Sequence, residues 1–183
     1  FLNLFEVPNL DLTQPWWDGN CVESLSMNNR LLAVAGSLNI NDKDATAALA
    51  FNKGYAESLG LPNIYEIVYE GEWTYDQLIS MAEGAAVDTD GNGIMEDTDM
   101  WGLLGGNDVM SCFWFGSGEL MVTKDENDIF QFTFGSERSI TASERVVNLM
   151  NQSWFLNHHK IANTDDAYYT QLFETGHGLF FWM

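Results

Sequence analysis

The chain has 183 residues and a formal net charge of −20, from 27 acidic and 7 basic side chains. Its length allows one domain with a hydrophobic core, and its 46% hydrophobic and 14% aromatic content is typical of a folded protein. A surface this acidic repels phosphate backbones and anionic lipid headgroups, so we expect no nucleic-acid or membrane-surface partner. No apolar run reaches the length of a membrane span, so direct membrane insertion is not expected either.

The ends of the chain lie within apolar stretches, residues 1–5 and 178–183, and the sequence has no initiator Met and no signal peptide. We therefore expect a segment of a longer protein, whose location the missing signal peptide does not reveal. Two cysteines, Cys21 and Cys112, are fewer than a small disulfide-stapled domain carries. Two unpaired thiols are favoured over a disulfide between them.

Predicted helices and strands alternate along the chain, which indicates an α/β domain. Residues 31–40 are predicted as a strand or crossover, and residues 45–52 contain a strand-like middle. Residues 53–59 then form a short helix, with Gly60 in the left-handed position that ends many helices.

A capping box of Thr74 and Gln77 starts the next helix. Four apolar residues with helical spacing face its inner side: Leu78, Met81, Ala82 and Ala85. Trp73, just before the cap, is favoured as a packing residue over a ligand contact. Residues 119–134 are then predicted as a hairpin with its polar turn at 124–128.

A second capping box at residues 141–144 is predicted to open a further helix. Its inner side would carry five residues: Val146, Val147, Leu149, Met150 and Trp154. A third helix runs through residues 167–173 and stops at Gly176, and a strand over 178–183 follows.

The sharpest local motif covers residues 88–99 and fits the calcium-loop pattern D-x-D-x-N-G-x5-acid. Calcium takes six to eight hard oxygen ligands, so it needs several carboxylates on a chain that can curl. We predict a structural Ca2+ bound by side-chain oxygens, one carbonyl (Ile94) and one residue acting directly or through water (Glu96); the full ligand set is Asp88, Asp90, Asn92, Ile94, Glu96 and Asp99. The side chain of Ile94 can point inward.

The alternative for this segment is an acidic surface turn. Two features weaken the metal site: Asn92 is neutral, and Asp99 is shorter than the Glu usual at the last position. After the acidic loop, residues 100–105 are predicted to form a strand or loop and not a helix. The sequence also has no second calcium loop with which this one could pair. A calcium switch is therefore not expected. Trp101, directly after the loop, is predicted to anchor it.

Several short motifs in order carry a family resemblance. They are residues 15–18 (PWWD), 45–53 (ATAALAFNK) and 70–74 (EGEWT), then the acidic loop with Trp101-Gly102, and residues 172–176 (LFETG) before an apolar strand. Together they resemble the extracellular solute-binding proteins (family 1) that serve carbohydrate ABC importers. Glu72 stands where the family pattern has Lys, at a position expected to be exposed.

The resemblance implies one lobe of a two-lobed α/β fold of the periplasmic-binding-protein type. Residues 1–44 would be the crossover between lobes, and residues 45–183 would be a truncated second lobe without the first lobe and the C-terminal helices. It also implies a parent that is extracellular, as a cell-surface lipoprotein or in the periplasm, and that delivers a small-molecule solute to an ABC permease. One lobe alone is expected to have no measurable affinity.

The resemblance also implies a sugar site in the loop after Trp101, which should approach the cleft between the lobes. The predicted ligand residues there are Asn107, Asp108, Ser111, Phe113 and Trp114, with Trp182 from the last strand added. Aromatic faces beside amide and carboxylate groups suit a sugar chemically. Core packing is an equal alternative for Trp114.

No catalytic fingerprint for a hydrolase, zinc protease, nucleotide-binding or dinucleotide-binding protein occurs. We therefore predict a binding protein and no enzyme. Two alternatives stay open. A calcium-dependent interaction module would explain the acidic loop, and a glycoside hydrolase fragment would need two of the many carboxylates to act as a pair.

Overall fold

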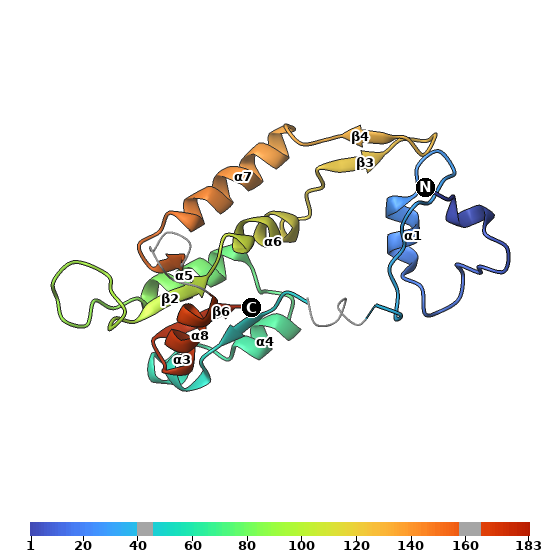
Figure 1. Cartoon of the computed structure of the whole chain (residues 1–183). Coiled ribbons are helices and arrows are strands. Elements are labelled where there is room, and N and C mark those ends of the chain that lie inside the picture. The colour runs from blue at the N-terminus through green and yellow to red at the C-terminus, as the bar shows by residue number, and fades with distance from the viewer. Residues whose placement is uncertain (40–45, 158–165) are drawn as a thin grey trace. The chain divides into compact units, whose positions relative to one another are not determined.

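The computed structural model describes residues 1–39, 46–157 and 166–183 (Figure 1). The chain divides into two compact units. Unit 1 comprises Phe1–Thr46 and Leu120–Ile140, and unit 2 comprises Ala47–Glu119 and Thr141–Met183. The expected boundary between residues 44 and 45 falls close to the first of these limits. The return of residues 120–140 to unit 1 was not expected from the sequence.

Unit 1 contains the short 3-10 helix η1 (Leu4–Glu6), helix α1 (Gly19–Leu25) and the antiparallel hairpin of β3 (Val122–Lys124) and β4 (Phe130–Phe132). The side chain of Asp18 caps α1 by accepting hydrogen bonds from the amides of Asn20 and Cys21. The hairpin predicted over residues 119–134 is confirmed, and Asp128 in its turn has a positive φ of 60°.

Residues 31–40 were predicted as a strand or crossover, and the strand alternative is wrong in the described part of that range, which contains only an isolated bridge between Trp17 and Gly36. The reason lies at Leu31, whose backbone groups bond elsewhere. Its amide donates to Asn3 Oδ1 at 3.0 Å, and its carbonyl accepts from the Leu4 amide at 2.7 Å. A side-chain partner and a single backbone partner thus replace a strand ladder.

Unit 2 is built on a four-stranded sheet of order β1-β6-β2-β5, with β1 antiparallel and the others parallel. The strands are β1 (Leu49–Phe51), β2 (Trp101–Gly105), β5 (Phe155–Asn157) and β6 (Gly178–Trp182). The predicted strands at 45–52 and 178–183 are confirmed as β1 and β6. This mixed sheet with helices confirms the expected α/β class.

Helices cover both faces of this sheet. They are α3 (Lys53–Ser58), α4 (Ile64–Tyr69), α5 (Tyr75–Ala85), α6 (Asp108–Gly116), α7 (Glu137–Met150) and α8 (Asp166–Glu174). The larger core joins residues of α3 to α7 with Leu103 and Phe180, whereas the smaller core joins α8 with Leu104 and Phe181. Leu103 and Leu104 fall into opposite cores, and so do Phe180 and Phe181, as expected for a sheet buried on both faces. Leu179 is an exception, because it belongs to the larger core together with Phe180.

Several predicted helix features are confirmed. Gly60 and Gly176 follow α3 and α8 with φ of 68° and 90°. Thr74 Oγ1 caps α5 by accepting from the Gln77 amide at 3.3 Å, and all four predicted inner residues of α5 are buried. The predicted start of α7 at the second capping box is wrong. The helix begins at Glu137, so Thr141 lies inside it.

The inner face predicted for α7 is mostly confirmed, since Val146, Leu149 and Met150 are buried. Val147 is wrong, because its side chain is 49% exposed. Trp154 is buried as predicted, although it lies beyond the last residue of the helix. Both cysteines are free thiols, in agreement with the favoured alternative. The described helices include none long and apolar enough to cross a membrane.

Candidate functional site

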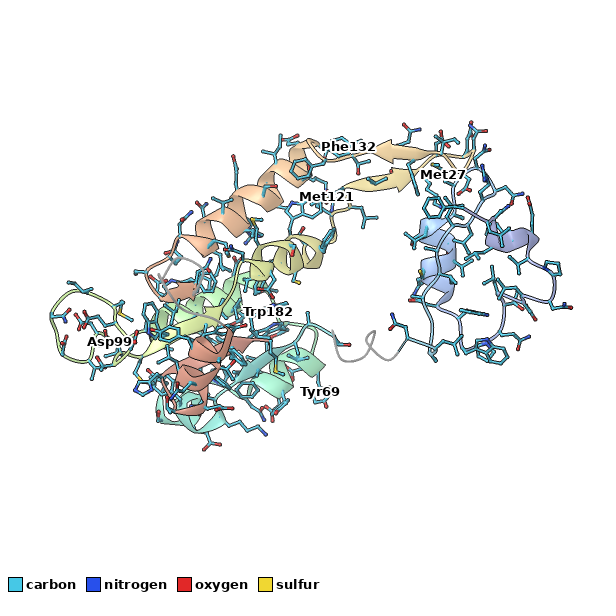
Figure 2. All side chains as sticks on the ribbon, viewed as in Figure 1. Met27, Tyr69, Asp99, Met121, Phe132 and Trp182 are labelled. Atoms are coloured by element: carbon cyan, nitrogen blue, oxygen red, sulfur yellow. The ribbon has the colours of Figure 1, made fainter. Side chains whose placement is uncertain are left out.

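Polar side chains gather where three neighbouring strands of unit 2 end. Helix α6 begins at Asp108, three residues after β2 ends at Gly105. Asp108 Oδ2 accepts a hydrogen bond from Trp182 Nε1 of β6 at 2.8 Å. Trp182 is labelled in Figure 2. Asn107 Oδ1 accepts from Asn157 Nδ2 at the end of β5 at 2.9 Å. The carboxyl ends of parallel strands are where open α/β sheets bind ligands.

This geometry brings together three of the residues predicted as ligand contacts, Asn107, Asp108 and Trp182. The predicted loop, however, is wrong over residues 108–114, which lie in helix α6 (Asp108–Gly116). Ser111 lies one turn into this helix, exposed, with its Oγ donating to the Asp108 carbonyl at 2.9 Å.

The helix turns two of its three aromatic residues, Phe113 and Trp114, inward, whereas Phe115 is 50% exposed. Phe113 is 9% exposed and Trp114 is 4% exposed. Trp114 Nε1 donates to Ser143 Oγ of α7 at 3.0 Å, so the ring belongs to the core and is held against α7. Phe113 belongs to the same core but also lines a cavity.

That cavity, of ≈ 600 Å³, lies wholly within unit 2. Four aromatic residues contribute to its lining: Trp73, Tyr75, Phe113 and Trp182. Their rings are fixed by mutual packing, with centroids 5.4 Å apart for Tyr75 and Phe113 and 5.6 Å apart for Phe113 and Trp182. Trp73 packs edge-on against Phe180 at 5.8 Å. No pattern in the sequence sets Trp73 apart from an ordinary packing residue.

Polar groups at the same cavity come from the start of α5 and from α7. Arg145 Nη2 and Asp76 Oδ1 form an ion pair at 2.5 Å, and the Arg145 guanidinium lies 5.9 Å from the centre of the Tyr75 ring. Burial raises the pKa of Tyr75, and the nearby positive charge of Arg145 opposes this shift. Ser117 and Thr74 add hydroxyl groups to the lining.

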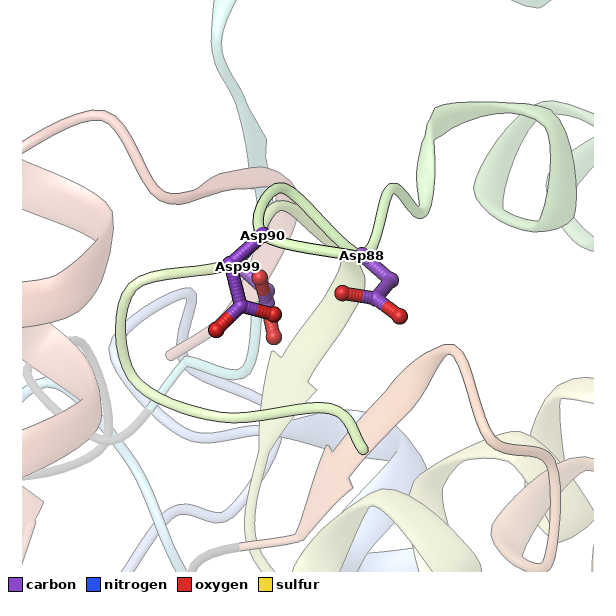
Figure 3. A group of neighbouring side chains, drawn as sticks. All are labelled: Asp88, Asp90 and Asp99. Carbon is purple, nitrogen blue, oxygen red and sulfur yellow. The ribbon is translucent and has the colours of Figure 1, made fainter. Parts of the chain in front are cut away.

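The acidic loop at residues 88–99 brings three carboxylates together. Asp88, Asp90 and Asp99 each offer one oxygen, and these oxygens lie within 4.8 Å of one another (Figure 3). Asp99 is 1% exposed, and its two oxygens accept from the amides of Thr89 and Glu96, each at 2.7 Å. The loop thus folds around a buried carboxylate.

Backbone amides also surround Asp88. Its oxygens accept from Gly93 at 2.6 Å and from Gly91 at 2.8 Å. The Gly93 amide is the main cause that lowers the pKa of Asp88, and burial opposes it. The carboxylate therefore stays ionised at neutral pH, which is the form that a cation binds.

Among the other predicted ligands of the loop, Asn92 contacts the carboxylate group directly, because its Nδ2 donates to Asp90 Oδ2 at 2.9 Å. Asn92 Oδ1 accepts from the Ile94 amide at 2.7 Å, and Glu96 lies outside the group of three carboxylates. The side chain of Ile94 is 61% exposed, so the expectation that it points inward is wrong. Trp101 Nε1 donates to the Glu96 carbonyl at 3.1 Å, which confirms Trp101 as an anchor of the loop.

Helix α8 also contacts the acidic loop, through a short hydrogen bond from the Tyr168 hydroxyl to Asp97 Oδ1. Burial raises the pKa of Tyr168, and the bond to Asp97 adds to this shift.

Comparison with known proteins finds a solved structure with a similar fold. No family model and no curated protein matches the chain. Among solved structures, the chain is similar to the ABC substrate-binding protein Lmo0181 from Listeria monocytogenes in complex with cycloalternan. The TM-score is 0.57 and the identity is 10%, over 100% of this chain and 42% of that chain. The chain therefore has the α/β fold of part of a solute-binding protein, and it spans less than half the length of that structure.

Proposed function

We propose that this chain is part of the solute-binding subunit of an ABC importer and that it captures its ligand without transforming it. The observation that carries the proposal is the fold likeness to a substrate-binding protein over 100% of this chain. The cluster of Asn107, Asp108 and Trp182 at the carboxyl ends of the strands supports it, because ligands of open α/β sheets bind at this edge.

The ligand class we propose is a sugar or oligosaccharide. The structural neighbour was solved with cycloalternan. In this chain an indole ring lies beside carboxylate and amide groups, and that combination suits the apolar faces and the hydroxyls of a pyranose. A net charge of −20 also disfavours anionic solutes. Trp114 carries no part of this proposal, because its ring is buried against α7.

The partners and location follow from the same proposal. A solute-binding subunit works outside the cytoplasmic membrane, so the protein would be extracellular or periplasmic, held at the cell surface as a lipoprotein in the first case. Its macromolecular partner would be the importer's permease.

Calcium is proposed as a structural ion in the acidic loop. The sequence pattern and the three oxygens within 4.8 Å of one another support it. Three carboxylates at such distances repel one another, and a divalent cation would offset that repulsion. A calcium-dependent interaction module remains the second candidate function, supported by the same loop.

The function is tested by calorimetric titration of the full-length protein with neutral oligosaccharides, cycloalternan among them. Trp182→Ala should weaken binding by about 1–3 kcal/mol, the scale of one large aromatic contact. Trp16→Ala, which removes an indole that is 48% exposed in unit 1, serves as the control and should leave affinity unchanged. Absence of binding to every sugar would contradict the proposal, and sugar hydrolysis would favour a glycosidase.

A further inference from the structure

We propose that the aromatic cavity of unit 2 is a subsite for one neutral pyranose ring, and that the Tyr75 hydroxyl hydrogen-bonds this ring. The inference rests on the proposed function, since it names a sugar as the ligand. It goes further in one respect. The cavity is formed by residues of unit 2 alone, so weak binding should need no second lobe, contrary to the expectation from the sequence.

The first argument is the character of the walls. Trp73, Tyr75, Phe113 and Trp182 supply rings that neighbouring rings hold in place. The Trp182 indole is fixed further by its hydrogen bond to Asp108. Fixed aromatic surfaces bind the apolar face of a sugar ring with little loss of side-chain entropy. The volume of ≈ 600 Å³ lies within the usual range of small-molecule sites.

The second argument is the Tyr75 hydroxyl, which is buried and has no hydrogen-bond partner among the described residues. A buried hydroxyl without a partner destabilises the folded state, so native proteins usually satisfy it. Tyr55 shows the usual arrangement nearby in the same unit, because its hydroxyl donates to the Ala85 carbonyl at 2.6 Å. The oxygen is closed to solvent in this structure, so a small shift of the ring must accompany binding. A hydroxyl of the bound polyol would then give Tyr75 the partner that Tyr55 already has.

The third argument is charge. The charged residues of the described lining are Asp76 and Arg145, and they neutralise each other as an ion pair. An ionic ligand would have to compete with this pair or leave its own charge unpaired. A neutral ligand keeps the pair intact and can still use the outward-facing atoms of both side chains for hydrogen bonds. The cavity therefore favours a neutral polyol over an amino acid or a sugar acid.

The binding test uses the 183-residue chain itself, with methyl α-glucoside and maltotriose as probes. The indole N–H signals of the seven tryptophans are followed by NMR as each probe is added. We expect saturable shifts at Trp73 and Trp182, and none at Trp101 and Trp154, which lie outside the lining. Cyclohexanol is the apolar ring of similar size. Equal affinity for cyclohexanol, or no shift with either sugar, would overturn the proposal.

The role of the hydroxyl is tested by the matched pair Tyr75→Phe and Tyr55→Phe. Each variant removes one oxygen and keeps the ring. Tyr75→Phe should raise the Kd for maltotriose about two- to tenfold, the effect of one hydrogen bond, and should leave Tm equal or higher because an unpartnered group is gone. Tyr55→Phe should lower Tm and leave Kd unchanged. If Tyr75→Phe lowers Tm as Tyr55→Phe does, the hydroxyl already has a partner and its proposed role is wrong.

A second pair of variants tests whether the cavity itself is the binding site, by adding a side chain at a glycine and removing no functional group. Gly116 lines the cavity near the end of α6, and a Cβ there would lie 3.6 Å from the Tyr75 hydroxyl oxygen, an ordinary contact. Gly116→Leu should therefore block the cavity and abolish the shifts at Trp73 and Trp182. Gly84→Leu on α5 meets nothing within 4 Å and should bind like the native chain. Unchanged binding by Gly116→Leu would overturn the cavity as the site.

Failure of this inference and failure of the proposed function give different results. If the cavity is not the subsite, the Tyr75 and Gly116 variants of the full-length protein bind oligosaccharide like the native protein, whereas Trp182→Ala still weakens binding. If the function itself is wrong, the full-length native protein binds none of these sugars.

Discussion

Trp114 and Trp182 both pack against a neighbouring phenylalanine ring in unit 2, with centroids 5.4 Å apart for Trp114 and Phe115 and 5.6 Å apart for Trp182 and Phe113. The two indoles nevertheless have different surroundings. Trp114 is buried, with its indole nitrogen bonded to α7, whereas Trp182 is partly exposed and bonded to Asp108. The sequence could not reveal that Trp114 is a core residue, because residues 109–115 are almost entirely apolar or small. Such a run has no polar face to reveal a helical period.

Core placement of Trp114 predicts a large loss of stability on truncation. Trp114→Ala should lower the free energy of unfolding by about 3–5 kcal/mol, since it removes a large buried ring and leaves a cavity. Urea denaturation monitored by circular dichroism measures this change. Trp16→Ala is the control and should change stability by about 0.5 kcal/mol or less, because that ring is 48% exposed. A loss no larger than the control's would mean that Trp114 is not part of the core.

At the scale of elements, the sequence predicted the helix ends and turns that depend only on neighbouring residues. The cap at Thr74, the stops at Gly60 and Gly176 and the hairpin turn all depend on residues within one turn of each other. The start of α7 was missed because two capping signals compete. Ser136 Oγ accepts from the Ser139 amide at 3.1 Å, so an earlier serine does the capping and Thr141 is left inside the helix.

The acidic loop yields a prediction about metal binding. If Asp88, Asp90 and Asp99 hold Ca2+, adding the ion should raise Tm, and a chelator should reverse the rise, because a ligand that binds the native state stabilises it. Thermal melts of the native chain and of Asp88→Asn measure this, and the variant should lose the response to calcium.

The control for the loop is Asp97→Asn, which removes the same charge from a residue outside the three-carboxylate group. Its amide oxygen can still accept the hydrogen bond from Tyr168. The calcium response should therefore persist in this variant. Equal melting points with calcium and chelator in the native chain would reject the site.

The hairpin of unit 1 yields a prediction about pH. Lys124 Nζ bonds Asp128 Oδ1 at 2.7 Å and Ser26 Oγ at 2.8 Å, and the hydrogen bond from Lys124 is the main cause that lowers the pKa of Asp128 below 3.8. Because the pKa of Asp128 is lower in the folded than in the unfolded chain, its ionised form stabilises the fold at pH values above the unfolded-state pKa. This stabilisation is lost as the pH falls through the lower pKa of the folded state.

Asp128→Asn should therefore lower Tm at neutral pH. The difference in Tm from the native chain should shrink in acid, where native Asp128 is protonated and is uncharged like Asn. Melts across this range check the sign. Glu126→Gln removes a negative charge from the same turn and leaves the pair of Lys124 and Asp128 in place, so it should show a smaller difference at neutral pH. A difference between native chain and Asp128→Asn that grows in acid would contradict the assignment.

At the scale of the whole molecule, the division into units depends on contacts that no local pattern encodes. The sequence predicted a first segment up to residue 44 and a second unit over the rest. Residues 120–140 instead belong with the N-terminal residues, because Lys124 and Asp128 bond Ser26, Asn28 and Asn29 about a hundred positions earlier. A polar turn at 124–128 could be predicted from sequence, but its partners could not.

The charge of the whole chain gives the last prediction. A net charge of −20 repels anions and attracts cations over distances that salt screens, with a Debye length of about 8 Å at physiological ionic strength. A neutral sugar carries no charge for this field to act on. The Kd of the full-length protein for an oligosaccharide should therefore stay constant when sodium chloride is raised from low to high concentration, as calorimetry can measure. Calcium supplies the internal control, because its affinity for the same protein should fall steeply over the same range. A sugar affinity that changes in parallel with the calcium affinity would mean that an ion is bound together with the sugar, and the expected independence of sugar binding from salt would be wrong.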